Sequence, residues 1–166
     1  MQIIERGLST QHYVIPVVVA IVYVLINSKL SETMRMRVGA ISAAGFPALY
    51  LNGGFGAWEF VYALVALVPA YYAQQSFKAI GVAWLMHGAW DLPHHLFGNT
   101  IWLSDPSSSL GCAIMDPLVA VWYFAGAPSI FERLKGWGVT RKRVTINVNY
   151  ESVPMPRQSS STNRSM

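Results

Sequence analysis

The nine residues His87-Gly88-Ala89-Trp90-Asp91-Leu92-Pro93-His94-His95 decide the fold class that this sequence predicts. They carry three of the four histidines of the chain and lie in an otherwise apolar stretch, residues 79–97. On a helix, at about 100° per residue, the three histidines and the aspartate fall within a sector of roughly 100°. Placing such a strip in the hydrocarbon core of a membrane costs free energy. Strips of this kind therefore usually face the interior of a helix bundle or a water-filled cavity. The stretch therefore predicts a central helix of a membrane bundle.

The composition of the chain agrees with a membrane domain. Of its 166 residues, 53% are hydrophobic and only 12% are charged, about half the charged fraction of an ordinary soluble domain. The formal net charge of +4 comes from the end of the chain, because residues 132–166 hold seven Lys/Arg and two Glu. We expect a transmembrane helix bundle over residues 1–131 and a basic, partly disordered cytosolic tail over residues 132–166. The single cysteine excludes an intramolecular disulfide.

Five apolar segments follow one another along the chain. The sequence predicts an all-α, polytopic membrane bundle of about five transmembrane helices, although the shorter segments only just span a core of about 30 Å. An alternative with four spans makes the second segment re-entrant or interfacial. Residues 27–37 are expected to form a loop, and the fourth helix is expected to contact the third and the fifth. The segments are residues 13–26, 38–51, 57–72, 79–97 and 110–127.

Basic residues predict the orientation of the bundle. They follow the first segment (Lys29, Arg35 and Arg37), the third (Lys78) and the fifth (residues 133–143), and the other two loops carry none. By the positive-inside rule, the N-terminus is expected outside or in a lumen and the C-terminus in the cytosol. This orientation brings Asn52 and the acidic and histidine residues of the spans into the outer half of the membrane. Because these polar residues converge there, the outer half of the membrane domain is the candidate functional site.

The spacing of His87 and Asp91 is i, i+4, so their side chains can hydrogen-bond along one helix face. A carboxylate that orients an imidazole makes a general acid/base pair or half of a metal site, and the alternative is a structural polar clasp between helices. His94 and His95 diverge by about 100° on a helix, so only one of them is expected to face the cavity. The alternative for that one is an interfacial histidine.

Two further acids complete the set of candidate catalytic residues. Asp116 precedes Pro117 in an apolar segment, and we expect it beside Asp91 with His87 between or next to them. Two carboxylates in a low-dielectric pocket cannot both stay ionised cheaply, so one should be protonated or paired with a charged histidine. Glu59 is expected as a gate or proton relay, or else as a solvated residue at a helix start. Cys112 is expected as a small core residue rather than a nucleophile.

Three stretches of the sequence resemble an uncharacterised family of small integral membrane proteins, a domain of unknown function. The resemblance covers about residues 15–130 and implies no established activity. The tail after residue 131 lies outside it. The stretches are Gly56-Ala-Trp-Glu59, then Gly81-Val-Ala-Trp-Leu-Met-His-Gly-Ala-Trp-Asp91 continuing to His94-His95-Leu-Phe-Gly-Asn99, and Ser107-Ser-Ser-Leu-Gly-Cys-Ala-Ile-Met-Asp-Pro117.

These observations favour a membrane-embedded enzyme that acts on a lipophilic small molecule by acid/base chemistry. A cyclase or isomerase of isoprenoid or polyketide metabolism is plausible by analogy only, and it needs no cofactor. The first alternative is a mononuclear metal-dependent hydrolase or oxygenase, with one divalent ion held by His87, Asp91, His94 and His95. The second is a non-catalytic scaffold or assembly factor. The expected partners are membrane lipid and the lipophilic substrate, not nucleic acid, and a homo-oligomer is compatible with the sequence.

Overall fold

The computed structural model describes residues 9–50, 54–97 and 107–138 of the chain. Every regular element in these ranges is a helix, and the described residues form no strand. The all-helical part of the predicted fold class is therefore confirmed. The elements in order are α1 (Gln11–Ser28), α2 (Glu32–Gly45), the 3₁₀-helix η1 (Phe46–Tyr50), α3 (Ala57–Tyr72), α4 (Phe77–Leu96), α5 (Ser108–Phe124) and α6 (Ile130–Gly138).

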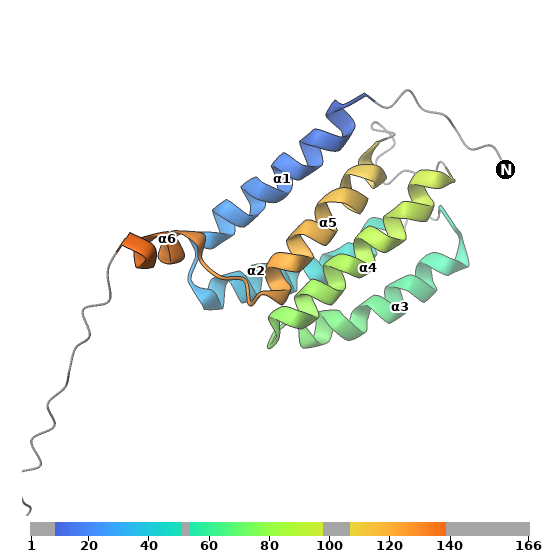
Figure 1. Ribbon diagram of the computed structural model, residues 1–166. Helices are drawn as coiled ribbons and strands as arrows, with labels where there is room; N and C mark the ends of the chain where they lie inside the picture. Colours follow the sequence, from blue (N-terminus) through green and yellow to red (C-terminus); the bar gives the residue numbers. More distant parts are fainter. Residues whose placement is uncertain (1–8, 51–53, 98–106, 139–166) are drawn as a thin grey trace, which may run out of the picture.

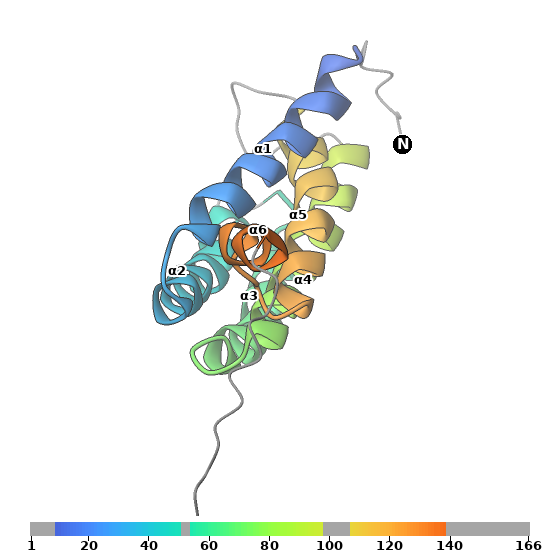
Figure 2. The ribbon, with the colours of Figure 1, turned by 60° about the vertical axis from the view of Figure 1, so that its left-hand side comes forward.

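Helix α4 occupies the middle of the bundle (Figure 1). Its most extensive partner is α5, and it also packs against α3 and α2. Helix α1 lies along the other side of α5, so α5 is held between α1 and α4 (Figure 2). The fourth helix thus contacts the third and the fifth, as its polar strip predicts.

Small residues allow the helices to pack closely. Alanines from five helices are buried with Ile80, Trp84, Val119 and Tyr123 in one core, and small side chains let helix backbones approach each other. The hydroxyls of Tyr23 on α1 and Tyr123 on α5 lie 2.8 Å apart and tie these two helices together. The alanines of this core are Ala20, Ala43, Ala70, Ala83 and Ala120 within the helices, and Ala73 and Ala127 after the ends of α3 and α5.

The helix starts follow local capping chemistry. The hydroxyl of Ser76 accepts a hydrogen bond from the Ala79 backbone N–H, and the α4 helix begins one residue after this cap. The hydroxyl of Ser31 accepts from the Met34 N–H in the same way at the start of α2. Helix α4 then continues through Pro93 to Leu96, so the whole polar strip stands on one helix.

The structure corrects the prediction of a loop over residues 27–37. Helix α2 begins at Glu32, because Ser31 caps it, and it therefore contains both Arg35 and Arg37. Arg35 is buried and its guanidinium donates a 2.8 Å hydrogen bond to the Leu30 carbonyl. The α-helix ends at Gly45, and a 3₁₀-helix with Pro47 follows, since proline has no N–H for the i→i−4 ladder.

Helix α6 is a second departure from the sequence prediction. It starts before residue 131, where the bundle was expected to end, and it runs to Gly138 within the expected tail. The remainder of the tail, and Asn52, lie outside the described residues.

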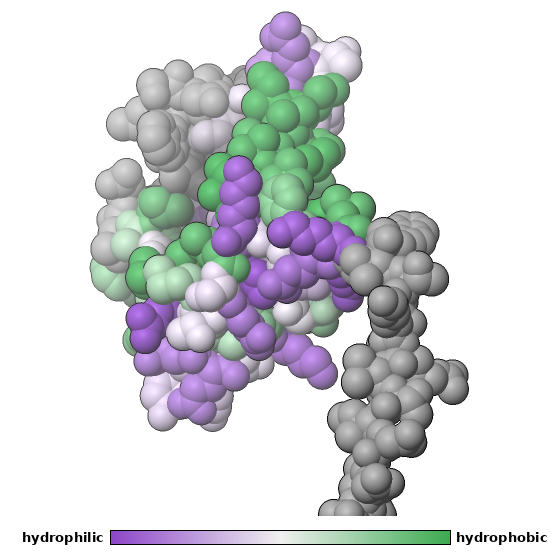
Figure 3. Space-filling model, turned by 90° about the vertical axis from the view of Figure 1, so that its left-hand side faces the viewer, coloured by the Kyte–Doolittle hydropathy of each residue, from purple (hydrophilic) through white to green (hydrophobic). Residues whose placement is uncertain are grey.

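One helix among the described residues is both long and apolar enough to cross a membrane, and that helix is α1. Only 22% of its apolar window is buried in the bundle, which is unlike the core helix of a soluble protein. Helices α3 and α5 are apolar but shorter, and α4 has the length while its polar strip lowers its hydropathy. Figure 3 shows the apolar surface of α1 rising above the hydrophilic end of the bundle.

Candidate functional site

The polar strip of α4 points into the bundle. His87, Asp91 and His94 lie on one face at i, i+4 and i+7, and their exposed fractions are 2%, 0% and 3%. Groups of this polarity are rarely buried without partners. The structure supplies those partners from η1, α3 and α5, and it divides the strip into two clusters.

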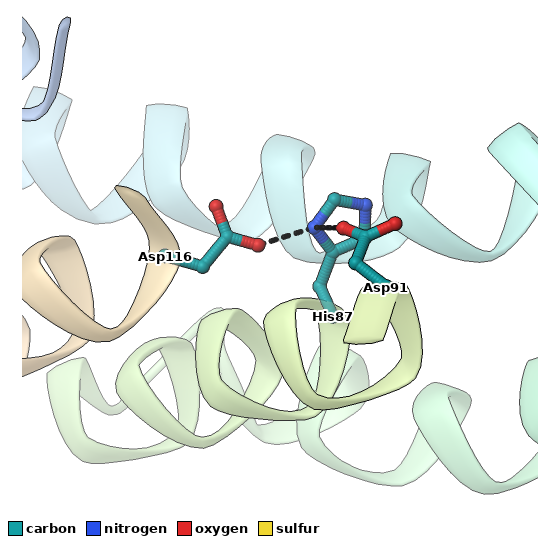
Figure 4. A network of polar contacts seen from close by, with 3 residues as sticks. All are labelled: His87, Asp91 and Asp116. Carbon is teal, nitrogen blue, oxygen red and sulfur yellow. Dashed lines mark hydrogen bonds and ion pairs between the residues drawn. The ribbon is translucent and has the colours of Figure 1, made fainter. Parts of the chain in front are cut away.

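The first cluster places His87 between two carboxylates (Figure 4). Its Nδ1 lies 2.5 Å from Oδ2 of Asp116 on α5 and 3.5 Å from Oδ2 of Asp91 one turn further along α4. An ionised carboxylate only accepts hydrogen bonds. The contact of a neutral His87 with the Asp116 carboxylate therefore requires the imidazole proton to be on Nδ1. Nε2 is then the acceptor nitrogen, and it is buried without a hydrogen-bond partner among the described residues.

Gly88 brings α5 close enough for this contact. A Cβ atom at position 88 would lie 3.0 Å from the Asp116 Cβ and 3.4 Å from both the Cys112 carbonyl and the Pro117 Cδ. Side chains larger than glycine would therefore push α5 away from α4. The glycine next to His87 is thus a direct determinant of the short distance between His87 and Asp116.

Asp91 is the least exposed of the candidate acids and has the fewest conventional partners. The Tyr50 hydroxyl and the Cys112 thiol both interact with its carboxylate. Neither contact has the geometry of a regular hydrogen bond, so both Asp91 oxygens stand without such a bond in the described structure. Burying a polar group without a hydrogen bond is costly. Asp91 is therefore the group of this cluster that is best able to accept a ligand.

Aromatic rings enclose the two histidines of the strip. Phe46 stacks on the His87 ring, with centroids 4.3 Å apart and planes 25° apart. The ring of Tyr50 lies between the two imidazoles, 5.6 Å from His87 and 4.9 Å from His94. Because both aromatic residues come from η1, the 3₁₀-helix forms a wall that both clusters share.

The second cluster is centred on Glu59, which is only 1% exposed although it stands in the first turn of α3. Its Oε1 accepts a 2.9 Å hydrogen bond from the Phe55 N–H and lies 3.2 Å from His94 Nε2. Its Oε2 accepts a 3.0 Å hydrogen bond from the Trp90 indole. Trp90 in turn stacks on Tyr62 of α3 at 5.0 Å. The alternative of a solvated helix-start glutamate is thereby wrong.

The structure separates residues that the sequence analysis grouped together. His94 pairs with Glu59, and His95 is half-buried on another side of α4. The metal-ligand set expected from the sequence is therefore not assembled. Among the described residues, the donor atoms that lie within 4.8 Å of one another belong to His87, Asp91 and Cys112.

Sequence reasoning missed three residues at the site, namely Tyr50, Tyr62 and Cys112. Tyr50 stands two residues before Asn52, which the sequence predicts to lie with the acids, and this proximity is a signal that the sequence did contain. Cys112 precedes Asp116 by one helical turn, and this spacing puts both on the α5 face toward α4. Tyr62, one turn after Glu59, reaches the site through its stacking with Trp90.

Comparison with known proteins gives a family and no activity. No curated protein and no solved structure matches the chain. One family model, described as a family of unknown function (DUF6010), matches residues 11–129, the part that contains α1 to α5 and both polar clusters. The match covers well over half of the chain, and the protein belongs to this DUF6010 family.

Proposed function

We propose that the chain is a multi-pass membrane protein in which α1, α2 with η1, α3, α4 and α5 all cross the bilayer. The support is the surface outside the bundle core. Monomeric soluble proteins rarely expose apolar patches of more than a few hundred Å², whereas α1 and α3 here expose nearly continuous apolar faces. On α3 the exposed large hydrophobic residues are Trp58, Phe60, Val61, Leu64, Val65, Leu67, Val68, Tyr71 and Tyr72.

The ends of the bundle support the orientation with the N-terminus outside and the C-terminus in the cytosol. Lys29 follows α1 and lies 5.9 Å from the Phe131 ring of α6, so the end of the first span stands next to the segment after the fifth. Hydrophilic side chains gather at this end of the bundle (Figure 3). The second polar cluster lies toward the other end, where α4 ends and α3 begins, and the first lies near the middle of α4 and α5.

Within this membrane domain, we propose an enzyme that moves protons on a lipophilic small molecule. The observation that carries the proposal is a fully buried imidazole between two fully buried carboxylates, with Asp91 free to take a ligand. Intramembrane ionisable groups are rare and usually functional. A resident acid and a resident base are the minimum that a cyclase or isomerase reaction needs.

Each residue of the first cluster has a distinct role in the proposed reaction. Protonated Asp91 donates its proton to one carbon of a carbon–carbon double bond or to an epoxide oxygen, and becomes a carboxylate. A neighbouring carbon of the resulting cation then loses a proton to that carboxylate, which restores the acid and leaves an isomer or a ring. Asp116 holds the His87 tautomer and orientation, and His87 carries a proton to or from Asp91.

The second cluster connects the site to the outer surface of the bundle. Tyr50 stands between His87 and His94, and His94 contacts Glu59 at the start of α3. We propose that a proton on His94 or Glu59 reaches the first cluster past Tyr50, whose hydroxyl interacts with the Asp91 carboxylate. We propose that Glu59 and His94 exchange protons with the outside and that Trp90 keeps Glu59 in place.

The experiment that tests this function compares lipid extracts of cells with and without the protein by untargeted mass spectrometry. Asp91→Asn, Asp116→Asn and His87→Ala should each remove the product that the wild-type chain forms, at unchanged protein abundance. Glu32→Gln is the matched control, because Glu32 is exposed at the start of α2. If the three variants fail to accumulate, or if the product persists in Asp91→Asn, the polar cluster is structural and a scaffold function takes its place.

A metal-dependent enzyme is a second candidate, because three different ligand types converge. His87, Asp91 and Cys112 offer nitrogen, oxygen and sulfur donors within 4.8 Å of one another, and this mixed set suits Zn²⁺ or a similar divalent transition ion. Asp116 on Nδ1 would then be the carboxylate that orients a ligating histidine through its other nitrogen. About one equivalent of metal after purification in mild detergent, lost in both Asp91→Asn and Cys112→Ala, would favour this candidate over the metal-free one.

A further inference from the structure

A groove separates the outer half of α1 from the first turns of α5. Its walls include Ile15, Pro16 and Val19 on α1 and Gly111, Cys112 and Met115 on α5. The cavity volume is about 260 Å³, just below the ~300–1,000 Å³ of typical ligand pockets. The groove is therefore large enough for one end of a lipophilic molecule, whose remainder would stay in the bilayer.

The chemistry of the groove changes along its length. Ser107, Ser108 and His12, which stand at the starts of α5 and α1, contribute polar groups at one end. Beyond them the walls are apolar, and Ile15 and Val19 are 58% and 44% exposed on the outer surface of α1. A molecule with one small polar group and an apolar body matches this lining, and it can enter sideways from the lipid.

Packing between the helices does not require the glycine at position 111. A Cβ atom there would meet only the Pro16 Cγ, at an ordinary contact distance of 3.7 Å. Glycine is disfavoured inside a helix relative to alanine, so close packing does not explain its presence. Its effect in the structure is to leave the floor of the groove without a side chain.

Cys112 joins the groove to the buried acid. Its side chain is half-buried, it lines the groove, and its thiol interacts with the Asp91 carboxylate, which is 0% exposed. The thickness of one side chain therefore separates a lipid-accessible groove from the acid of the first cluster. Rotation about one bond of Cys112 is enough to change that separation.

We propose that the groove between α1 and α5 is the entrance for the lipophilic substrate, and that the Cys112 side chain is the gate between it and Asp91. The proposal rests on the proposed acid/base function and adds a route and a substrate class. The substrate is an apolar chain with a single small polar group such as a hydroxyl or an epoxide. The body of the molecule lies against Ile15, Val19 and Met115, and the reacting carbon passes Cys112.

The chain offers its own probe of this groove, because Cys112 is the single cysteine. The full chain in mild detergent is treated with N-ethylmaleimide, and labelling of the thiol is followed by intact mass. Farnesol, a lipophilic alcohol, is the competing probe. At about ten times its dissociation constant it should slow the labelling roughly tenfold. Gly111→Leu should slow the labelling without farnesol and remove the farnesol effect.

Control variants separate an effect on the groove from a general effect on the fold. Gly45→Leu is the matched control, because a Cβ atom there meets nothing within 4 Å and the position stands outside the groove, and this variant should behave as the wild type. If Gly111→Leu does not accumulate, Ile15→Trp fills the groove from the exposed side of α1. Reaction of wild-type Cys112 only after denaturation, no protection by farnesol, or equal protection in the filled variants would overturn the proposal.

This assay is independent of turnover, so the two proposals can fail separately. Asp91→Asn keeps the groove walls and should retain the farnesol protection. If farnesol still protects Cys112 and Asp91→Asn still forms product, the groove binds lipophilic molecules but the acid/base function is ruled out. Loss of product in Asp91→Asn, without any farnesol protection in the wild type, would support the acid/base function and rule out the groove as the entrance.

Discussion

The His87 Nδ1 and the Asp116 Oδ2 lie 2.5 Å apart in the centre of the bundle, although they belong to different helices. This contact affects both the packing of the helices and the orientation of a side chain. It joins the most closely packed helix pair, α4 and α5, and it sets the orientation of the imidazole toward Asp91. The proposed proton transfer and the folding of the bundle therefore depend on one interaction, and experiments must separate the two.

A double-mutant cycle measures the coupling of this pair. We expect His87→Ala and Asp116→Ala each to lower the apparent melting temperature in detergent, because each leaves a buried polar group without its partner. The double variant should lose less than the sum, with a coupling of about 0.5–3 kcal/mol. Melting is followed by circular dichroism. Additive effects would show that the contact is not maintained in the folded protein.

Gly88 and Gly45 offer a matched pair of substitutions. Gly88→Ala places a Cβ 3.0 Å from the Asp116 Cβ, and this overpacking should destabilise the fold by about 1–3 kcal/mol. Gly45→Ala meets nothing within 4 Å and should be neutral. The apparent melting temperatures of both variants are compared in one detergent. Equal behaviour of the two would mean that α4 and α5 are further apart than in the structure.

Trp90 is expected to stabilise the fold through Glu59. Trp90→Phe keeps an aromatic ring against Tyr62 but removes the 3.0 Å hydrogen bond to the Glu59 carboxylate. The loss should be about 0.6–2 kcal/mol, the range of hydrogen bonds between membrane helices. Trp58→Phe is the control, because Trp58 is 65% exposed. The prediction fails if thermal melting shows the same change for both substitutions.

The sequence predicts the helices and the polar strip because both depend on local periodicity. The i, i+4 spacing puts His87 and Asp91 on one face whatever surrounds them. The partners of that face are determined by tertiary packing. Neither Cys112 beside Asp91 nor Tyr50 between two histidines follows from spacing, because each depends on how η1 and α5 approach α4. The division of the strip into two clusters likewise depends on Glu59, whose burial at a helix start is set by Trp90.

The predicted loop over residues 27–37 failed for a physical reason that also bears on topology. Arginines are common in loops, but Arg35 can stay in a helix because the Leu30 carbonyl accepts its hydrogen bond at the bundle end. The helix therefore extends beyond the apolar segment. The basic residues keep their place at the end of the bundle, so the predicted orientation is the same with or without the loop.

The orientation of the bundle can be tested with a tag at each end of the chain. Lys29, Arg37, Lys78 and Arg133 all stand at or near helix ends on the side of the bundle where α1 ends and α6 begins. Basic residues near span ends remain on the cytosolic side during insertion, so a tag after Met166 should resist protease added to intact cells that carry the protein in the plasma membrane. A tag before Met1 should be cleaved under the same conditions, and detergent should expose both. A C-terminal tag cleaved from outside, with the N-terminal tag protected, would reverse the bundle. Glu59 and His94 would then face the cytosol, and protons would enter the site from that side.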